Sequence, residues 1–140
     1  MPTIFTKIID GEIPGTFVWR DDRCVAFMSI NPLRAGHVLV VPRDEVDHWI
    51  DCPAHLRDHL MAVSTSIGEA IHEVYDPTKV GFMIAGLEVP HLHIHLVPID
   101  GVHDLDFANA AASVDRQELE EEAASLRYAL TSMGADGVAQ

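Results

Sequence analysis

One ten-residue segment constrains the fold of this chain more than any other, because histidine alternates in it with aliphatic residues. Residues 89–98 read Val-Pro-His-Leu-His-Ile-His-Leu-Val-Pro. Successive side chains of a strand point to opposite faces, so a strand here places His91, His93 and His95 on one face, about 6.5 Å apart at each step. The aliphatic side chains between them then face the core. The segment predicts a strand that presents three imidazoles in a row on a rigid element.

Apolar residues at steps of three and four predict a long helix over residues 51–75. Asp51 or Cys52 is the expected N-cap, with Pro53 in the first turn. Asp76 and Pro77 end the helix.

A second helix is predicted from about Arg116 to Met133. Asp115 is its expected N-cap, and Gly134 suits the stop at its end. We expect the residues after Gly134, through Gln140, to be frayed.

Short apolar or β-branched runs bounded by turn residues predict five strands, and a short helix is expected between Ile4 and Ile9. The resulting order is three strands, a helix, two strands and a terminal helix, which indicates an antiparallel α+β domain with helices against one sheet face. The chain after about Asp100 carries few strand signals and many acidic residues. We therefore expect a domain over residues 1–100 and an acidic extension with one helix over residues 101–140. The strand candidates are residues 17–20, 24–28, 37–41, 80–85 and 91–97.

Composition and charge limit the partners of the chain. The 140 residues carry a net charge of -13, so the general field repels the phosphates of long nucleic acids, while a small phosphate-bearing ligand needs only local donors. No apolar run reaches the ~18 residues that span a bilayer. The N-terminus lacks the pattern of a signal peptide, and Cys24 and Cys52 form no Cys-x-x-Cys pair. These features predict a cytoplasmic protein with no nucleic-acid or membrane partner.

The histidine row has two further interpretations. It can be an exposed strand face that happens to be rich in histidine. It can also supply two zinc ligands in a His-x-His pattern, with His37 or Glu88 as a third. The regular alternation favours a dedicated site over either alternative.

Three blocks of the chain together resemble the histidine triad (HIT) family. The row His-Leu-His-Ile-His-Leu-Val at residues 91–97 is similar to the family signature, in which histidine alternates with apolar residues. The opening at residues 4–14 and the segment at residues 30–42 also resemble the family, in the same order. The resemblance implies a HIT fold with a five-stranded antiparallel sheet, and a homodimer.

The resemblance also implies a mechanism without metal or cofactor. The middle histidine, here His93, attacks the α-phosphorus of a nucleoside phosphate derivative and forms a covalent nucleotidyl-histidine that water hydrolyses. His91 and His95 are expected to orient the phosphoryl oxygens, and His37 to support the triad from a neighbouring strand. A histidine at position 95, rather than glutamine, resembles the hydrolase branches of the family.

The expected substrate-binding residues are Ser29, Asn31, Gly86, Leu87 and Glu88, and several depart from the family pattern. Ser29 replaces an aspartate that holds the ribose hydroxyls, so it offers no bidentate carboxylate. Leu87 and Glu88 replace a glutamine and a serine or threonine near the phosphate. The Cys-x-x-Cys through which some members bind zinc is replaced by Thr3 and Thr6.

The sequence leaves three functions open. The first is hydrolysis of nucleoside phosphoramidates or related nucleoside monophosphate derivatives. The second is hydrolysis of dinucleoside polyphosphates, and the third is nucleotide binding with little turnover. Whether the C-terminal helix packs on its own sheet or on a homodimer partner is also open.

Overall fold

The computed structural model describes all 140 residues and is built on one antiparallel sheet of five strands in the order β1-β2-β3-β5-β4. Every neighbouring pair of strands is antiparallel. The sheet and helices confirm the α+β class and the five-stranded arrangement expected from the resemblance. The strands are β1 (Phe17–Arg20), β2 (Cys24–Met28), β3 (Val38–Pro42), β4 (Lys79–Met83) and β5 (Ile94–Ile99).

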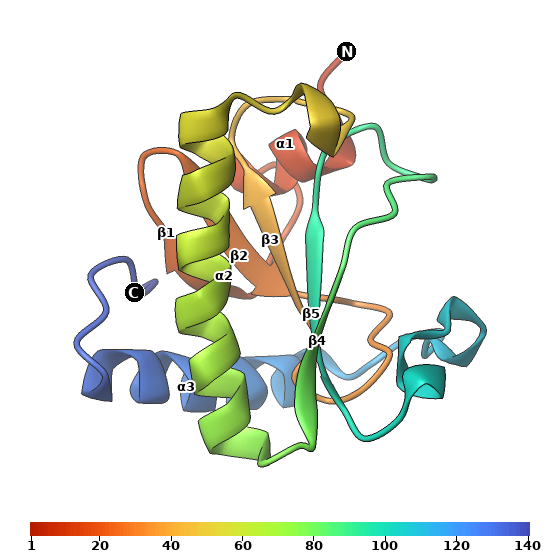
Figure 1. Cartoon of the computed structure of the whole chain (residues 1–140), viewed down its shortest axis with the longest axis vertical. Helices are drawn as coiled ribbons and strands as arrows, with labels where there is room; N and C mark the ends of the chain where they lie inside the picture. Colours follow the sequence, from red (N-terminus) through yellow and green to blue (C-terminus); the bar gives the residue numbers. More distant parts are fainter.

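Two helices, α2 (Ala54–Tyr75) and α3 (Arg116–Ser132), cover one face of this sheet, and they cross each other in Figure 1. They share a core of 22 buried residues with the sheet. The members from α3 are Leu119, Ala123, Leu126, Ala129 and Leu130. The C-terminal helix therefore packs on its own sheet and α2, and residues 101–140 share one core with the rest of the chain. No helix of the chain is both long and apolar enough to cross a membrane.

The opposite face of the sheet is covered at one end by the short helix α1 (Ile4–Ile9), which begins and ends where the sequence predicted. Phe5 and Ile9 of α1 pack on four side chains from β2 and β3 in a second, smaller core. This face also carries the triad histidines, so α1 lies beside the candidate site.

Local hydrogen bonds explain where the long helices begin and end. Asp115 caps α3 by accepting from Gln117 N, and Asp76 ends α2 in the left-handed conformation, both as predicted. After α3, Gly134 has φ +80° and its N–H donates to Thr131, while Ala135 N donates to Leu130, which is the Schellman pattern.

The predicted start of α2 was wrong. Asp51 closes a separate 3-10 turn, Trp49–Asp51, and Cys52 follows that turn. The helix begins at Ala54, after Pro53, which makes no side-chain cap. Proline is tolerated at the start of a helix, and the Pro53 carbonyl accepts the first helical hydrogen bonds, from Leu56 N and Arg57 N.

The predicted start of the histidine strand was also wrong, because β5 begins at Ile94 and includes only His95 of the triad. The N–H groups before Ile94 bond outside the sheet: His91 N donates to Val89 O and Leu92 N to Val46 O. The alternation of faces nevertheless continues through this segment, since the aliphatic residues Leu92, Ile94 and Leu96 all lie in the main core.

The expectation of a frayed C-terminus was wrong. Val138 forms a β-bridge with Trp19, and Ala139 N donates to Val18 O. Arg20 N donates to Gly137 O at 2.8 Å on the other side of the bridge. The last residues thus extend the sheet beyond β1, which explains why Ala139 is buried.

Candidate active site

The four histidines that the sequence singled out lie together on the α1 side of the sheet, and all are buried. His91 and His37 are 0% and 2% exposed, while His93 and His95 are 8% and 7% exposed. Buried imidazoles need hydrogen-bond partners. Those partners decide which ring nitrogen of each histidine carries the proton, and which ring nitrogens have no partner in the chain.

His91 is held at both ring nitrogens. Its Nε2 donates to Pro42 O at 2.7 Å, and its Nδ1 lies 2.7 Å from Thr3 Oγ1, whose hydroxyl is the donor. Neither nitrogen remains for a substrate, and the ring has no exposed surface. His91 also holds its neighbour in the triad, because its backbone carbonyl lies 2.8 Å from His93 Nδ1.

That carbonyl sets the state of His93. His93 Nδ1 lies 2.8 Å from His91 O, and since a carbonyl only accepts, Nδ1 carries the hydrogen. In the neutral ring, Nε2 then keeps its lone pair, and no group of the chain bonds to it. Burial lowers the pKa of His93, so the ring stays neutral at physiological pH.

His37 and His95 form a relay that ends with a free donor. Leu33 N donates to His37 Nδ1 at 3.0 Å, which places the ring hydrogen of His37 on Nε2. This Nε2 donates to His95 Nδ1 at 2.9 Å, so His95 carries its own hydrogen on Nε2. Burial lowers the pKa of His37 to about 3 and that of His95 to about 4, so the pair is neutral at pH 7.

Two aromatic rings border the pair His93 and His95. Phe5 of α1 lies edge-on to His93 with ring centroids 4.8 Å apart, and Phe107 lies edge-on to His95 at 5.2 Å. The two histidine rings are themselves 4.9 Å apart. His93, with an unpartnered Nε2 lone pair, and His95, with an unpartnered Nε2–H, are thus neighbouring rings bordered by phenylalanine, a setting in which electrostatic interactions are strong.

The loop that leads into His37 depends on glycine. Gly36 has φ +91°, a region that side chains rarely adopt, and a Cβ there would meet the Tyr75 ring at 2.5 Å. Its N–H donates to Glu122 Oε1 at 2.9 Å. Glycine therefore allows the loop to pass close to α2 and turn into β3.

The predicted substrate-binding residues lie in two places: two precede β3, near the histidine pair, and three are in the loop after β4. Ser29 is buried beside the relay, with its N–H donating to His37 O and its Oγ accepting from Asn31 N. Asn31 is occupied, because its Nδ2 donates to Ala111 O and Ala112 O. Gly86 has φ +70° in the loop after β4, and Leu87 in the same loop is 93% exposed and belongs to neither core.

Glu88 lies in the same loop and is exposed, yet its charge raises the pKa of His93 slightly against the larger effect of burial. It is therefore near enough to the triad to act electrostatically. Its carboxylate makes no hydrogen bond within the chain, so it is free to meet a ligand.

Thr3, Phe5, Phe107 and Glu122 were not selected from the sequence. Thr3 and Phe5 lie in or beside the opening block, but only the tertiary structure shows that they contact His91 and His93. Phe107 and Glu122 have no motif around them and reach the site from segments far along the chain.

Metal ligands are few around the triad. His37 and His91 use both ring nitrogens, which leaves the Nε2 atoms of His93 and His95. Elsewhere, Asp21, Cys24 and His59 place one ligand atom each within 4.8 Å of one another. Hydrogen bonds account for that cluster: His59 Nε2 donates to Asp21 Oδ2 at 2.7 Å, and burial raises the pKa of the Cys24 thiol.

At the N-terminus, Thr3 and Thr6 are tied together by Glu45. Its Oε1 accepts from Thr3 N at 2.8 Å and from the Thr6 hydroxyl at 2.6 Å. Thr3 Oγ1 accepts from Thr6 N and meets His91, as described above. A hydrogen-bonded network thus joins α1 to the triad.

With the geometry established, comparison with known proteins assigns the chain. Residues 10–102 match the HIT domain. The chain belongs to the HIT family. A HIT-like protein of Methanocaldococcus jannaschii is 35% identical over 100 residues, which cover 68% of this chain and 77% of that protein. The adenosine 5'-monophosphoramidase HNT1 of Saccharomyces cerevisiae is 31% identical over 96 residues, 68% of this chain and 61% of the yeast enzyme.

Solved structures of HIT proteins share the fold. A Hit-like protein of Bartonella henselae, described as involved in cell-cycle regulation, superposes with a TM-score of 0.81 at 28% identity and covers 91% of this chain and 95% of its own. A zinc-bound histidine triad protein of Mycobacterium smegmatis gives 0.78 at 25% identity, covering 94% of each chain. Membership supports a nucleotide hydrolase or nucleotide-binding protein, since the family includes the yeast phosphoramidase.

Proposed function

We propose that this HIT protein hydrolyses nucleoside phosphoramidates, or related nucleoside monophosphate derivatives, through a covalent nucleotidyl-histidine on His93. The observation that supports this most directly is the tautomer of His93. Its Nδ1–H is held by His91 O at 2.8 Å, and its neutral Nε2 has no partner within the chain. A neutral imidazole whose other nitrogen is fixed is a competent nucleophile near pH 7.

The reaction runs in two displacements. His93 Nε2 attacks the α-phosphorus, the phosphorus–nitrogen bond breaks, and the amine leaves with a proton from water. Water then attacks the same phosphorus, releases the nucleoside monophosphate and returns a proton, so His93 is regenerated. In this mechanism the free Nε2–H of His95 donates to a phosphoryl oxygen and stabilises its charge in both steps.

The electrostatics of the site favour an amine over a polyphosphate as leaving group. None of the hydrogen bonds of the triad histidines involves a lysine or arginine. The one charged group that influences His93 from outside the histidines is the carboxylate of Glu88. The phosphoramidate nitrogen becomes positive when it takes its proton before departure, and that carboxylate attracts it, whereas it repels a departing polyphosphate. The yeast relative is named for phosphoramidase activity.

Intact-mass spectrometry after a rapid quench tests the proposal. The protein is mixed with an adenosine 5'-phosphoramidate and quenched in acid-free denaturant. We expect a mass increase of one nucleotidyl group, which is absent in His93→Ala and retained in His55→Ala, an exposed histidine on α2. An adduct that persists in His93→Ala would identify a different nucleophile. No adduct together with no released AMP would favour nucleotide binding without turnover.

Hydrolysis of dinucleoside polyphosphates is the second candidate, because it uses the same nucleophile with a different leaving group. Turnover of a diadenosine polyphosphate compared with that of a phosphoramidate separates the two. Glu88→Gln provides a sharper comparison, since it removes the repelling charge. We expect it to improve the polyphosphate relative to the phosphoramidate.

We also propose that the protein acts as a homodimer in the cytoplasm. The sheet ends in β4, an edge strand whose outer backbone groups have no partner in the chain. Exposed apolar side chains gather at this edge around one small pocket; they are Phe82 of β4, Trp49 and Met61. A second copy that covers this edge would bury them. The two cysteines are free, which suits a reducing compartment.

A further inference from the structure

The loop of residues 31–36, here called the relay loop, is held by the chain segment of residues 100–122, here called the C-terminal arm. Asn31 Nδ2 donates to Ala111 O and Ala112 O at 3.1 and 2.9 Å. Ala111 N donates back to Pro32 O at 3.0 Å. The two segments lie about 80 residues apart in the sequence, so these bonds are tertiary rather than local.

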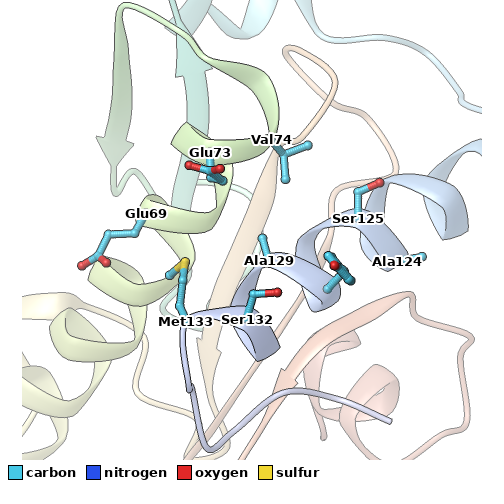
Figure 2. A pocket seen from close by; sticks show the side chains of 9 residues that line it. Glu69, Glu73, Val74, Ala124, Ser125, Ala129, Ser132 and Met133 are labelled. Carbon is cyan, nitrogen blue, oxygen red and sulfur yellow. The ribbon is translucent and has the colours of Figure 1, made fainter.

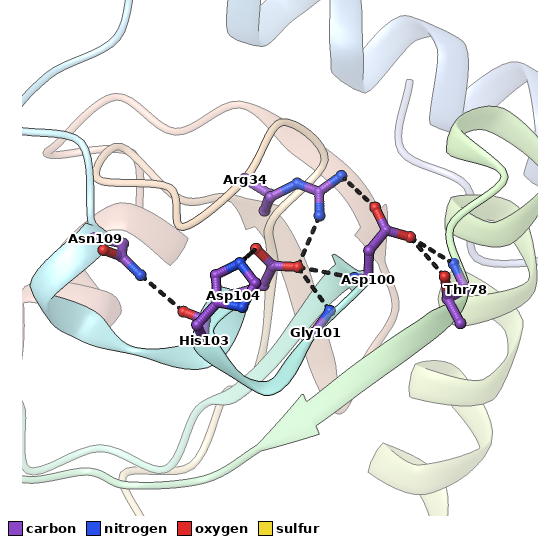
Figure 3. Close-up of polar contacts among 7 residues, drawn as sticks. All are labelled: Arg34, Thr78, Asp100, Gly101, His103, Asp104 and Asn109. Carbon is purple, nitrogen blue, oxygen red and sulfur yellow. Dashed lines mark hydrogen bonds and ion pairs between the residues drawn. The ribbon is translucent and has the colours of Figure 1, made fainter.

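Arg34 makes the second attachment of the relay loop (Figure 3). Its guanidinium donates to Asp104 Oδ2 at 2.9 Å and to Asp100 Oδ2 at 3.2 Å. Asp104 Oδ2 also accepts from Asp100 N and Gly101 N. Asp100 Oδ1 accepts from Thr78 N and Oγ1, which connects the network to the start of β4. Arg34 is therefore held by two carboxylates that are themselves fixed by backbone donors.

The third attachment is at the end of the loop, where Gly36 N donates to Glu122 Oε1 of α3 at 2.9 Å. Burial raises the pKa of Glu122 and this hydrogen bond opposes the shift. The relay loop is thus fixed at its beginning, middle and end by one continuous stretch of chain. The family match ends at residue 102, before most of that stretch.

This loop determines the state of the histidine relay. Leu33 N, in the middle of the relay loop, is the donor that keeps His37 Nδ1 unprotonated. If Leu33 N moves away, His37 can carry its hydrogen on Nδ1 and no longer donates to His95. His95 Nδ1 would then lose its donor, and the tautomer with a free Nε2–H would lose its advantage. The arm also places the Phe107 ring against His95, which restricts it from the other side.

We propose that the C-terminal arm is a positioning element for the relay, and that Asn31, Arg34 and Glu122 act through the tautomer of His95. Asn31 thereby has a different role from the substrate contact expected from the sequence. The proposal deepens the proposed function, because it concerns the same histidines and rests on that function for its effect on turnover. Its structural part does not depend on turnover, since the tautomers exist in the free protein.

Long-range ¹⁵N–¹H correlation spectra of the full-length protein report the tautomer of each histidine. In the wild type we expect Nε2–H for His37 and His95 and Nδ1–H for His93. In Asn31→Ala with Arg34→Met, we expect His95 to become a mixture of tautomers. Where turnover is measurable, kcat should fall roughly tenfold or more with a smaller change in KM, as misplacement of a positioned group predicts.

Matched variants separate positioning from general damage. Arg57→Met removes an exposed ion pair on α2, away from the arm, and should leave the His95 spectrum unchanged. Glu122→Gln keeps an acceptor for Gly36 N and should resemble the wild type, whereas Glu122→Ala should shift His95.

The outcomes distinguish this proposal from the function itself. Wild-type tautomers at His95 in both Glu122→Ala and the folded Asn31→Ala, Arg34→Met protein would overturn it, whatever the activity. A wild-type protein without turnover would contradict the proposed function, and the spectra would still show whether the C-terminal arm sets the tautomer of His95. If the double variant does not fold, Glu122→Ala against Glu122→Gln gives the same comparison with a smaller perturbation.

Discussion

At the scale of single residues, each imidazole differs from the others by what holds its nitrogens. Both ring nitrogens of His91 have hydrogen-bond partners, Thr3 and Pro42. Those of His37 bond to Leu33 and His95. Only His93 and His95 keep an Nε2 without a partner. One free Nε2 is a lone pair and the other is a donor. The sequence identified all four histidines through the alternation and the family blocks. It could not assign their tautomers, because the deciding partners are backbone carbonyls, an N–H and a hydroxyl supplied by tertiary structure.

Thr3→Val tests the first of these contacts. The substitution keeps the shape of the side chain and removes the hydroxyl, which donates to His91 Nδ1 at 2.7 Å and also caps α1 by accepting from Thr6 N. A buried acceptor then loses its partner at a cost of about 1–3 kcal/mol. We expect a stability loss of that size, measured by urea unfolding, and a lower rate of adduct formation on His93. Thr65→Val is the control, because it removes a hydrogen bond from the Thr65 hydroxyl to Met61 O on the exposed face of α2. Equal effects of the two variants would contradict a specific role for Thr3.

The neutral relay predicts loss of stability in mild acid. The pKa values of His37 and His95 are lowered to about 3 and 4 from an ordinary 6.5, so below pH 6.5 the unfolded chain binds protons first. This stability is complete above pH 6.5 and declines as the pH falls toward 4, by up to about 1.4 kcal/mol per pH unit for each histidine. The pKa of Asp21 is also lowered, but its ordinary value is 3.8, so the stability that Asp21 contributes is lost only below about pH 3.8.

Urea unfolding between pH 7 and pH 5 measures this dependence. His37→Gln should reduce the slope, whereas His55→Gln, which changes an exposed histidine, should not. A slope in His37→Gln equal to that of the wild type would show that His37 is not buried in its neutral form.

At the scale of elements, the sequence predicted best where local pattern and local turns decide the structure. α1, β1 and β2 begin and end at the predicted residues, because turn residues bound short apolar runs there. α2 begins later than predicted because a separate 3-10 turn and Pro53 precede it. β5 begins later because Leu92 N bonds to Val46 O rather than to a strand. The arm that holds the relay loop could not be predicted, because its bonds join residues about 80 positions apart without a motif.

The C-terminal bridge gives a direct test at this scale. Removal of residues 137–140 deletes the bonds from Arg20 N to Gly137 O and from Ala139 N to Val18 O, and uncovers Trp19. At about 1 kcal/mol for each hydrogen bond, we expect a loss of about 2 kcal/mol or more in the free energy of unfolding. Removal of Gln140 alone, which is exposed, should change nothing. A frayed tail, as the sequence predicted, would make the two truncations equal.

At the scale of the whole molecule, two apolar surfaces compete as the place where a second copy binds. One is the β4 edge, where Trp49, Met61 and Phe82 surround a small cavity of about 60 Å³. The other is the groove of about 850 Å³ between α2 and α3, with Tyr128 and Met133 at its walls. In Figure 2 the groove is bordered by Glu69 and Glu73 on the α2 side. Two copies that meet at this groove bring their acidic rims together, whereas the β4 edge offers unpaired backbone groups as well as apolar side chains.

The proposed dimer at β4 therefore makes a prediction that distinguishes the two surfaces. Met61→Lys with Phe82→Lys places two charges in the patch, and burial of unpaired charges is costly. We expect light scattering after gel filtration to give twice the mass of one chain for the wild type and the mass of one chain for this variant. Tyr128→Lys, at a side chain that is 73% exposed in the rival groove, should remain a dimer. A monomeric Tyr128→Lys beside a dimeric Met61→Lys, Phe82→Lys protein would move the interface to α2 and α3.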